Sequence, residues 1–137
     1  MTPPIATLRI ATGGRGLHEL TDDVARHVRA AGVRDGLCTL FVQHTSASLL
    51  LQENADPSVC RDLEAFLQRL APEGSELWTH DAEGPDDMPA HVRAALTQTH
   101  LAIPVIDGEL ALGTWQGIYL WEHRRRGSTR RVLVHVR

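Results

Sequence analysis

The chain has 137 residues, which is enough for one domain over residues 1–137 with a real core and too short for a second module. Its net charge of -3 and its hydrophobic fraction of 42% are typical of a globular protein and favour neither a nucleic-acid nor a membrane partner. All 14 basic residues are arginine, which excludes chemistry that needs a lysine, such as a Schiff base or a P-loop.

The first residues, MTPPIATLRIATGG, lack the basic stretch and the apolar run of a signal peptide. No segment reaches the roughly 18 consecutive apolar residues that a membrane span needs. We therefore predict a cytoplasmic protein. Its two cysteines, Cys38 and Cys60, show no paired spacing and are expected to be reduced thiols.

The first half of the chain alternates strand and helix patterns. Apolar and polar residues alternate over residues 5–11, which predicts a half-buried strand. A helix follows, with Thr21 as its N-cap and Gly32 at its end. Residues 36–54 are apolar on both faces up to a Thr-Ser-Ala-Ser run, which indicates a central strand that delivers hydroxyl groups to a site. Asp56 then caps a second helix that has Pro57 in its first turn.

The second half opens on the stretch WTHDAEGPDDMPAHVR, residues 78–93, in which Asp86 or Asp87 can cap a third helix with His91 one turn in. Strand patterns follow over residues 101–106, 109–114, 115–123 and 130–137, with an Asp-Gly hairpin turn at positions 107 and 108. We expect Gln116 to face a pocket and Trp115 to pack in apolar surroundings, because neighbouring side chains of a strand point to opposite faces. The sum is an α+β chain of about seven or eight strands in a two-layer β-sandwich, with three helices packed outside.

Three histidines on separate predicted elements are candidate metal ligands: His44, His80 and His91. Neutral imidazole is a common ligand of zinc and other transition metals, and nearby carboxylates can orient it. Their spacing matches no short metal motif, so separate surface or capping histidines are the alternative. The hydroxyls beside His44 are suited to hydrogen-bonding a ligand, although an irregular strand would also explain them; they belong to Thr45, Ser46 and Ser48.

The acids of the stretch 78–93 exceed what a helix cap needs. Asp86 and Asp87 together with Glu83 could bind a divalent cation or serve as general acid and base, whereas a cap in the favourable helix dipole is the simpler alternative. The segment HRRRGSTRR, residues 123–131, holds five arginines. It is either a solvated hairpin turn or a clamp for phosphate or carboxylate.

Four stretches of the chain resemble the YjbQ-like family, whose members are often labelled secondary thiamine-phosphate synthase. They are QHTSASLLLQENADPSV (43–59), HDAEGPDDMPAHV (80–92), GTWQGIYLWEHR (113–124) and GSTRRV (127–132). The resemblance implies a jelly-roll-like β-sandwich that assembles as a homotrimer, with pockets near the subunit boundaries. The chain departs from the family at Gln98-Thr99-His100, where Gly-x-Ser is frequent.

The resemblance also implies residue roles. His44, His80 and His91 correspond to histidines that gather around a bound metal. Polar positions match at Glu53, Asp56, Asp86, Asp87, Gln116 and Glu122.

We therefore expect a metal-dependent enzyme that acts on a phosphorylated or otherwise anionic small molecule. In its most specific form it joins a pyrimidine methyl diphosphate to a thiazole phosphate and releases diphosphate, with Asp86 and Asp87 holding a divalent ion. The phosphate oxygens would be gripped by Arg124, Arg130 and Arg131. Three histidines suit zinc or another transition metal better than magnesium, so a zinc-type hydrolase with Glu53 or a nearby carboxylate as base is an alternative. A trimeric module that binds a metabolite or metal without transforming it is a further one.

Overall fold

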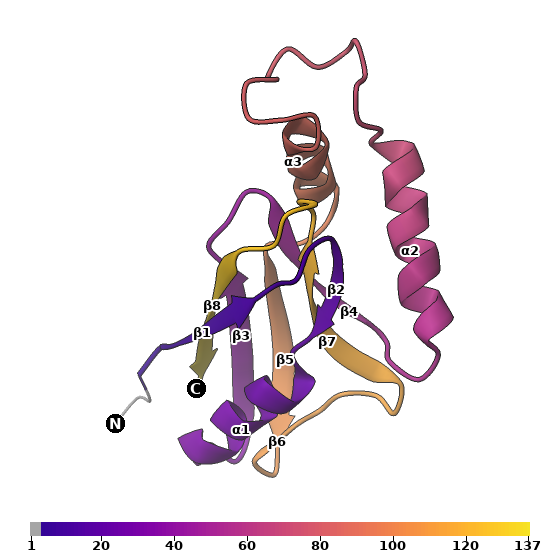
Figure 1. Ribbon diagram of the computed structural model, residues 1–137. Helices are drawn as coiled ribbons and strands as arrows, with labels where there is room; N and C mark the ends of the chain where they lie inside the picture. Colours follow the sequence, from indigo (N-terminus) through magenta and orange to yellow (C-terminus); the bar gives the residue numbers. More distant parts are fainter. Residues whose placement is uncertain (1–3) are drawn as a thin grey trace.

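The computed structural model describes residues 4–137, which form eight strands and three helices. The strands are β1 (Ala6–Ala11), β2 (Gly16–Glu19), β3 (Gly36–Val42), β4 (Ala47–Glu53), β5 (His100–Ile106), β6 (Glu109–Leu110), β7 (Gln116–Glu122) and β8 (Thr129–Val136). The helices are α1 (Thr21–Ala31), α2 (Pro57–Leu70) and α3 (Asp87–Leu96). One antiparallel sheet has the order β1-β8-β3-β5-β6 and the other β2-β7-β4 (Figure 1). The predicted α+β sandwich with outer helices is confirmed.

The core lies between the two sheets because the strands of each sheet turn one row of apolar side chains inward. Strand β3 buries Cys38, Leu40 and Val42, and Leu40 pairs with Leu101 of β5 in the antiparallel register. The smaller sheet adds Leu49, Ile118 and Leu120 to the same cluster. Burial raises the pKa of the Cys38 thiol to about 11, and both cysteines are free.

Helix α1 closes one end of this core. It contacts β6 and β8 of the larger sheet and β7 of the smaller one, and it buries Val24 and Val28 completely. Gly32 ends the helix with φ 69°, as predicted. The prediction of Thr21 as N-cap is wrong: its hydroxyl accepts a hydrogen bond from the backbone N–H of Ile118 (2.9 Å) and so ties the helix to β7 instead.

Helix α2 packs beside the smaller sheet. Its start is as predicted, because the Asp56 carboxylate accepts a hydrogen bond from the backbone N–H of Ser58 (2.9 Å) and Pro57 opens the helix. Glu64 in the middle of α2 accepts from Trp121 Nε1 of β7 at 3.0 Å and from Arg93 of α3 at 3.3 Å. This one carboxylate therefore joins α2, α3 and the sheet.

The two faces of β7 differ as the alternation predicts. Ile118 and Leu120 lie in the core, whereas Tyr119 and Trp121 are buried on the opposite face, which carries the contact to α2. The expectation of apolar packing for Trp115 is wrong, because this side chain is 62% exposed in the turn before β7 begins. Within residues 4–137, none of the helices has the length and hydropathy needed to cross a bilayer.

Candidate functional site

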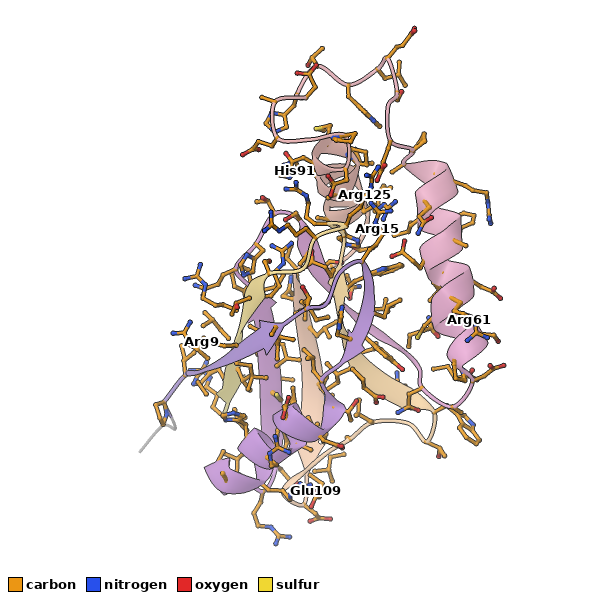
Figure 2. The ribbon with its side chains drawn as sticks, in the orientation of Figure 1. Arg9, Arg15, Arg61, His91, Glu109 and Arg125 are labelled. Carbon is orange, nitrogen blue, oxygen red and sulfur yellow. The ribbon has the colours of Figure 1, made fainter. Side chains whose placement is uncertain are left out.

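The candidate site lies at the start of α3, next to the loop that joins α2 to α3; Figure 2 shows His91 on this helix. Asp87 is the first residue of α3 and His91 follows four positions later, so both side chains lie on the same face of the helix. Pro89 fits the first turn, where a backbone N–H has no partner within the helix. His80 reaches the same point from the loop.

Four ligand atoms meet at this point, one each from His80, Glu83, Asp87 and His91, and all lie within 4.8 Å of one another. Asp87 Oδ2 is 2.9 Å from His80 Nε2 and 3.2 Å from His91 Nε2. Glu83 Oε2 is 3.3 Å from His80 Nε2. Ligand atoms arranged tetrahedrally at about 2.0 to 2.1 Å from a zinc ion are roughly 3.3 Å apart, so the cluster needs little adjustment to hold such an ion.

The hydrogen bonds of His91 determine where its proton lies. Nδ1 is 3.0 Å from the carbonyl oxygen of Thr45, which can only accept, so Nδ1 carries the hydrogen. In the neutral ring, Nε2 then presents a lone pair to the Asp87 carboxylate, and two acceptors face each other. Only a metal ion or an added proton makes that contact favourable. Metal-binding histidines are commonly held by their second nitrogen in this way.

Arg124 fixes the orientation of the acids. Its guanidinium donates to Asp87 Oδ1 at 2.7 Å, to Asp86 Oδ2 at 3.0 Å and to the backbone oxygen of Glu83 at 3.0 Å. Asp87 therefore has one oxygen on Arg124 and the other free for the histidines. Burial opposes ionisation of Asp87, but the hydrogen bond from His80 and the charge of Arg124 outweigh it and hold the pKa of Asp87 below its ordinary value.

Asp86 has a different role from Asp87. It occupies the N-cap position of α3, but its side chain makes no capping hydrogen bond. Its Oδ2 accepts instead from Arg124 Nε and from the backbone N–H of Arg125, both at 3.0 Å. Burial opposes ionisation here too, yet these bonds hold the pKa of Asp86 below its ordinary value. Neither aspartate side chain is the helix cap that the sequence allowed as the simpler alternative.

His44, the third predicted metal ligand, is not part of the cluster that residues 4–137 form. Its Nε2 accepts a hydrogen bond from the backbone N–H of Arg131 at 2.9 Å. Burial, together with the charges of Arg130 and Arg131, lowers the pKa of His44, which suits a neutral acceptor. The structure therefore brings together two of the three histidines, and the residue after His44, Thr45, holds His91 through its carbonyl oxygen.

Glu122 and Arg130 form a second, separate polar group inside the sandwich. Glu122 is fully buried and accepts from Arg130 Nε and from Thr12 Oγ1, both at 2.7 Å. Burial alone would raise the pKa of Glu122, but these two hydrogen bonds outweigh it and hold the pKa below its ordinary value. Arg130 also donates to Ser46 Oγ at 2.9 Å. Ser48 is fully buried as well and bonds to His123, so these groups already have partners within the chain.

Glu53 and Gln116 lie away from the cluster. They are cross-strand partners at one end of the β4–β7 pair, whereas Ala47 and Glu122 are partners at the other end, next to the loop that holds His91. Six residue steps at about 3.3 Å each place the two ends roughly 20 Å apart. Gln116 is exposed and accepts from the backbone N–H of Gly113 at 2.8 Å.

Of two further residues near the site, the sequence indicated the role of Glu83 but not the burial of His123. Glu83 supplies the fourth ligand atom of the cluster, a position that agrees with the cation-binding role the sequence allowed for it beside Asp86 and Asp87. His123 is completely buried, with Nε2 2.8 Å from Ser48 Oγ, and burial lowers its pKa to about 3. Its place beside an arginine run in the sequence gave no sign of this.

Comparison with known proteins decides the family. A model of the UPF0047 protein YjbQ-like family matches residues 6–137. The chain belongs to the YjbQ-like family. UPF0047 protein sll1880 of Synechocystis sp. is 54% identical over 129 residues, covering 94% of this chain and 88% of that protein. UPF0047 protein YjbQ of Escherichia coli O157:H7 is 44% identical and covers 93% of each chain.

Solved structures agree with this assignment. The hypothetical protein APE1520 from Aeropyrum pernix K1 superposes on the YjbQ-like chain with a TM-score of 0.89 at 26% identity, covering 98% of each chain. The family match over residues 6–137 includes all four ligand residues of the cluster. The resemblance inferred from the sequence motifs is therefore confirmed over almost the whole chain.

Proposed function

We propose that this YjbQ-like protein is a metal-dependent enzyme whose ion is held by His80, Asp87 and His91. One observation carries the proposal: His91 Nε2 faces the Asp87 carboxylate at 3.2 Å while its Nδ1 is committed to a carbonyl oxygen. That arrangement is unfavourable for a neutral ring without a cation between the two groups. The Arg124 guanidinium on the far oxygen of Asp87 supports the proposal, because outer hydrogen bonds of this kind orient metal ligands.

The ligand types favour zinc or another transition metal over magnesium. Two imidazoles and one carboxylate resemble the three-ligand sets of catalytic zinc sites, which leave a position open for water or substrate. Zinc in such a site lowers the pKa of bound water to about 7 and polarises substrate oxygens. Glu83, 64% exposed at its side chain, lies close enough to act as a fourth ligand or as a general base.

The substrate that suits this site is a small molecule whose anionic group binds the ion directly. The guanidinium groups of Arg124 and Arg130 are already paired with carboxylates of the chain, so they are poor candidates to grip a second anion. Arg131 is exposed and remains the predicted phosphate contact. The open metal position would be the main positive group offered to the substrate.

Two reactions fit this description. Hydrolysis is favoured by the two imidazole ligands and by Glu83 beside them. Transfer of the thiamine-phosphate synthase type, which joins a pyrimidine methyl diphosphate to a thiazole phosphate, is favoured by the second carboxylate, since Glu83 and Asp87 together also offer oxygen ligands to magnesium. Assays for diphosphate release from this substrate pair and for hydrolysis of phosphate and carboxylate esters distinguish the two.

The metal site itself is tested first. Protein without a histidine tag is titrated with zinc, nickel and manganese by calorimetry, and the bound metal is measured by elemental analysis. His91→Ala should weaken binding at least roughly 10-fold because it removes a ligand. His44→Ala is the matched control and should leave the affinity unchanged, since His44 Nε2 bonds to a backbone N–H. Wild-type protein that binds none of the three ions would end the proposal, and metal binding without turnover would leave a non-catalytic binding module.

A further inference from the structure

A pocket of about 380 Å³ lies beside the candidate metal site. It is formed by the α2–α3 loop, which arches over the start of α3 in Figure 1, and by the first turn of that helix. Its bulky walls are Trp78, Pro85 and Met88. His80 lines the pocket and also belongs to the metal cluster, so the two features are contiguous through one imidazole ring.

Two hydrogen bonds within the loop fix the position of Trp78. The indole Nε1 donates to the carbonyl oxygen of Pro72 at 3.0 Å, and the Trp78 backbone N–H donates to the carbonyl oxygen of Ser75 at 3.2 Å. A wall of the pocket is Gly84, which has φ 102°, a conformation that side-chain-bearing residues rarely adopt. A tethered aromatic ring in a pocket whose lining also includes Gly84 forms a preorganised site for a flat group.

The charges that line the pocket disfavour a phosphate there. Asp81 and His80 are ionisable groups of its lining, and among the described residues that line it none is an arginine. Arg124 lies behind Gly84, but its guanidinium already serves Asp86 and Asp87. An anion in this pocket would meet the Asp81 carboxylate without a compensating cation, whereas a neutral or cationic group would not.

We propose that this pocket binds an aromatic, uncharged or cationic group of the substrate, stacked against Trp78, while the anionic group of the same molecule reaches the metal. The part of this inference that places the anionic group on the metal rests on the proposed metal site. It narrows the substrate class to molecules that carry a flat ring at one end and a metal-binding anion at the other. Stacking on a fixed aromatic side chain supplies the affinity for the ring.

Two hydroxamates test this on the zinc-loaded protein. Acetohydroxamate and benzohydroxamate share a metal-binding group and differ in the phenyl ring. Wild-type protein should bind benzohydroxamate roughly 10-fold or more tightly than acetohydroxamate. Trp78→Ala should bring that ratio close to one without changing acetohydroxamate binding. Trp115→Ala is the matched control, because Trp115 is 62% exposed in the turn before β7, and it should keep the wild-type ratio.

A second measurement needs no metal. Benzamidine, a cationic ring, should shift the indole N–H resonance of Trp78 in metal-free protein, and benzoate at equal concentration should not. If benzamidine leaves this resonance unmoved, or if both hydroxamates bind zinc-loaded protein equally, the pocket is not a ring-binding site and the inference is wrong. If benzamidine binds but neither hydroxamate does, the pocket stands and the proposed metal site fails.

Discussion

Replacing each aspartate at the start of α3 by asparagine should separate metal binding from folding. Asp87→Asn removes a negative charge from the oxygen that lies 2.9 Å from His80 Nε2 and 3.2 Å from His91 Nε2. The new amide can still donate to these nitrogens, so the fold should survive. Loss of the carboxylate should weaken metal binding roughly 10 to 100-fold, which corresponds to about 1.4 to 2.7 kcal/mol.

Asp86→Asn should do the opposite. Asp86 Oδ2 accepts from Arg124 and Arg125, and Asp86 is not among the four clustered ligand residues, so its replacement weakens charge-assisted bonds inside the fold. We expect the free energy of unfolding to fall by roughly 1.5 to 3 kcal/mol, and the metal affinity to stay within a few-fold of wild type. Urea unfolding in the presence of a chelator and calorimetric zinc titration measure both quantities. Equal metal affinity in both variants and wild type would show that Asp87 is not a ligand.

Two further outcomes are expected. His123 has a pKa of about 3 in the folded protein and an ordinary value of 6.5. Below about pH 6.5 the unfolded chain therefore binds a proton at this residue while the folded chain does not, so the free energy of unfolding falls as the pH drops. The free energy of unfolding should decrease by about 1.4 kcal/mol from this group between pH 7.5 and pH 5.5, and His123→Gln should lose that part of the pH dependence; an imidazole that titrates between about pH 5 and 7 by NMR would contradict it. From its resemblance to the YjbQ-like family, we also expect the protein to be a homotrimer of about 45 kDa, three times its 15.1 kDa, and Leu37 and Phe41, which are exposed on the larger sheet, are apolar residues that an interface would cover. Light scattering of wild type and Phe41→Glu tests this, and a wild-type monomer would refute it.

The fold followed from the sequence because its signals are local. Hydrophobic patterning predicted β1, β5, β7 and β8, and Gly32 and Pro57 marked a helix end and a helix start that the structure confirms. The single strand expected over residues 36–54 is wrong, because the chain turns after Val42 and forms β3 and β4 in different sheets, and β2 was not predicted. Thr21 failed as a cap because a tertiary partner, the backbone N–H of Ile118, competes for its hydroxyl. Trp115 failed because strand alternation says nothing about the residue just before a strand begins.

The site could be predicted only where its residues are close in sequence. His80, Asp87 and His91 lie within twelve positions, and the four-residue spacing within α3 fixes two of them on one face. The position of His44, thirty-six residues before His80, relative to the cluster depends on how β3 and β4 pack against α3. Hydrophobic periodicity does not predict such packing. Instead of a ligand, that segment supplies the Thr45 carbonyl oxygen, a backbone group that no side-chain motif can reveal.

The charges at the start of α3 give an independent reason to expect a cation. Arg124 pairs with the carboxylates of Asp86 and Asp87, and a third carboxylate, that of Glu83, lies 3.3 Å from His80 Nε2. The Arg125 side chain is paired with Glu73. With neutral imidazoles these three carboxylates and the Arg124 guanidinium carry a net charge of -2, and Asp87 is almost fully buried. A divalent ion would cancel that charge, and so would protons on the two histidines. Protons and metal then compete for the same nitrogen lone pairs, so zinc affinity must fall as the pH is lowered, whereas an ion bound elsewhere on the surface by carboxylates alone would show no dependence on histidine protonation.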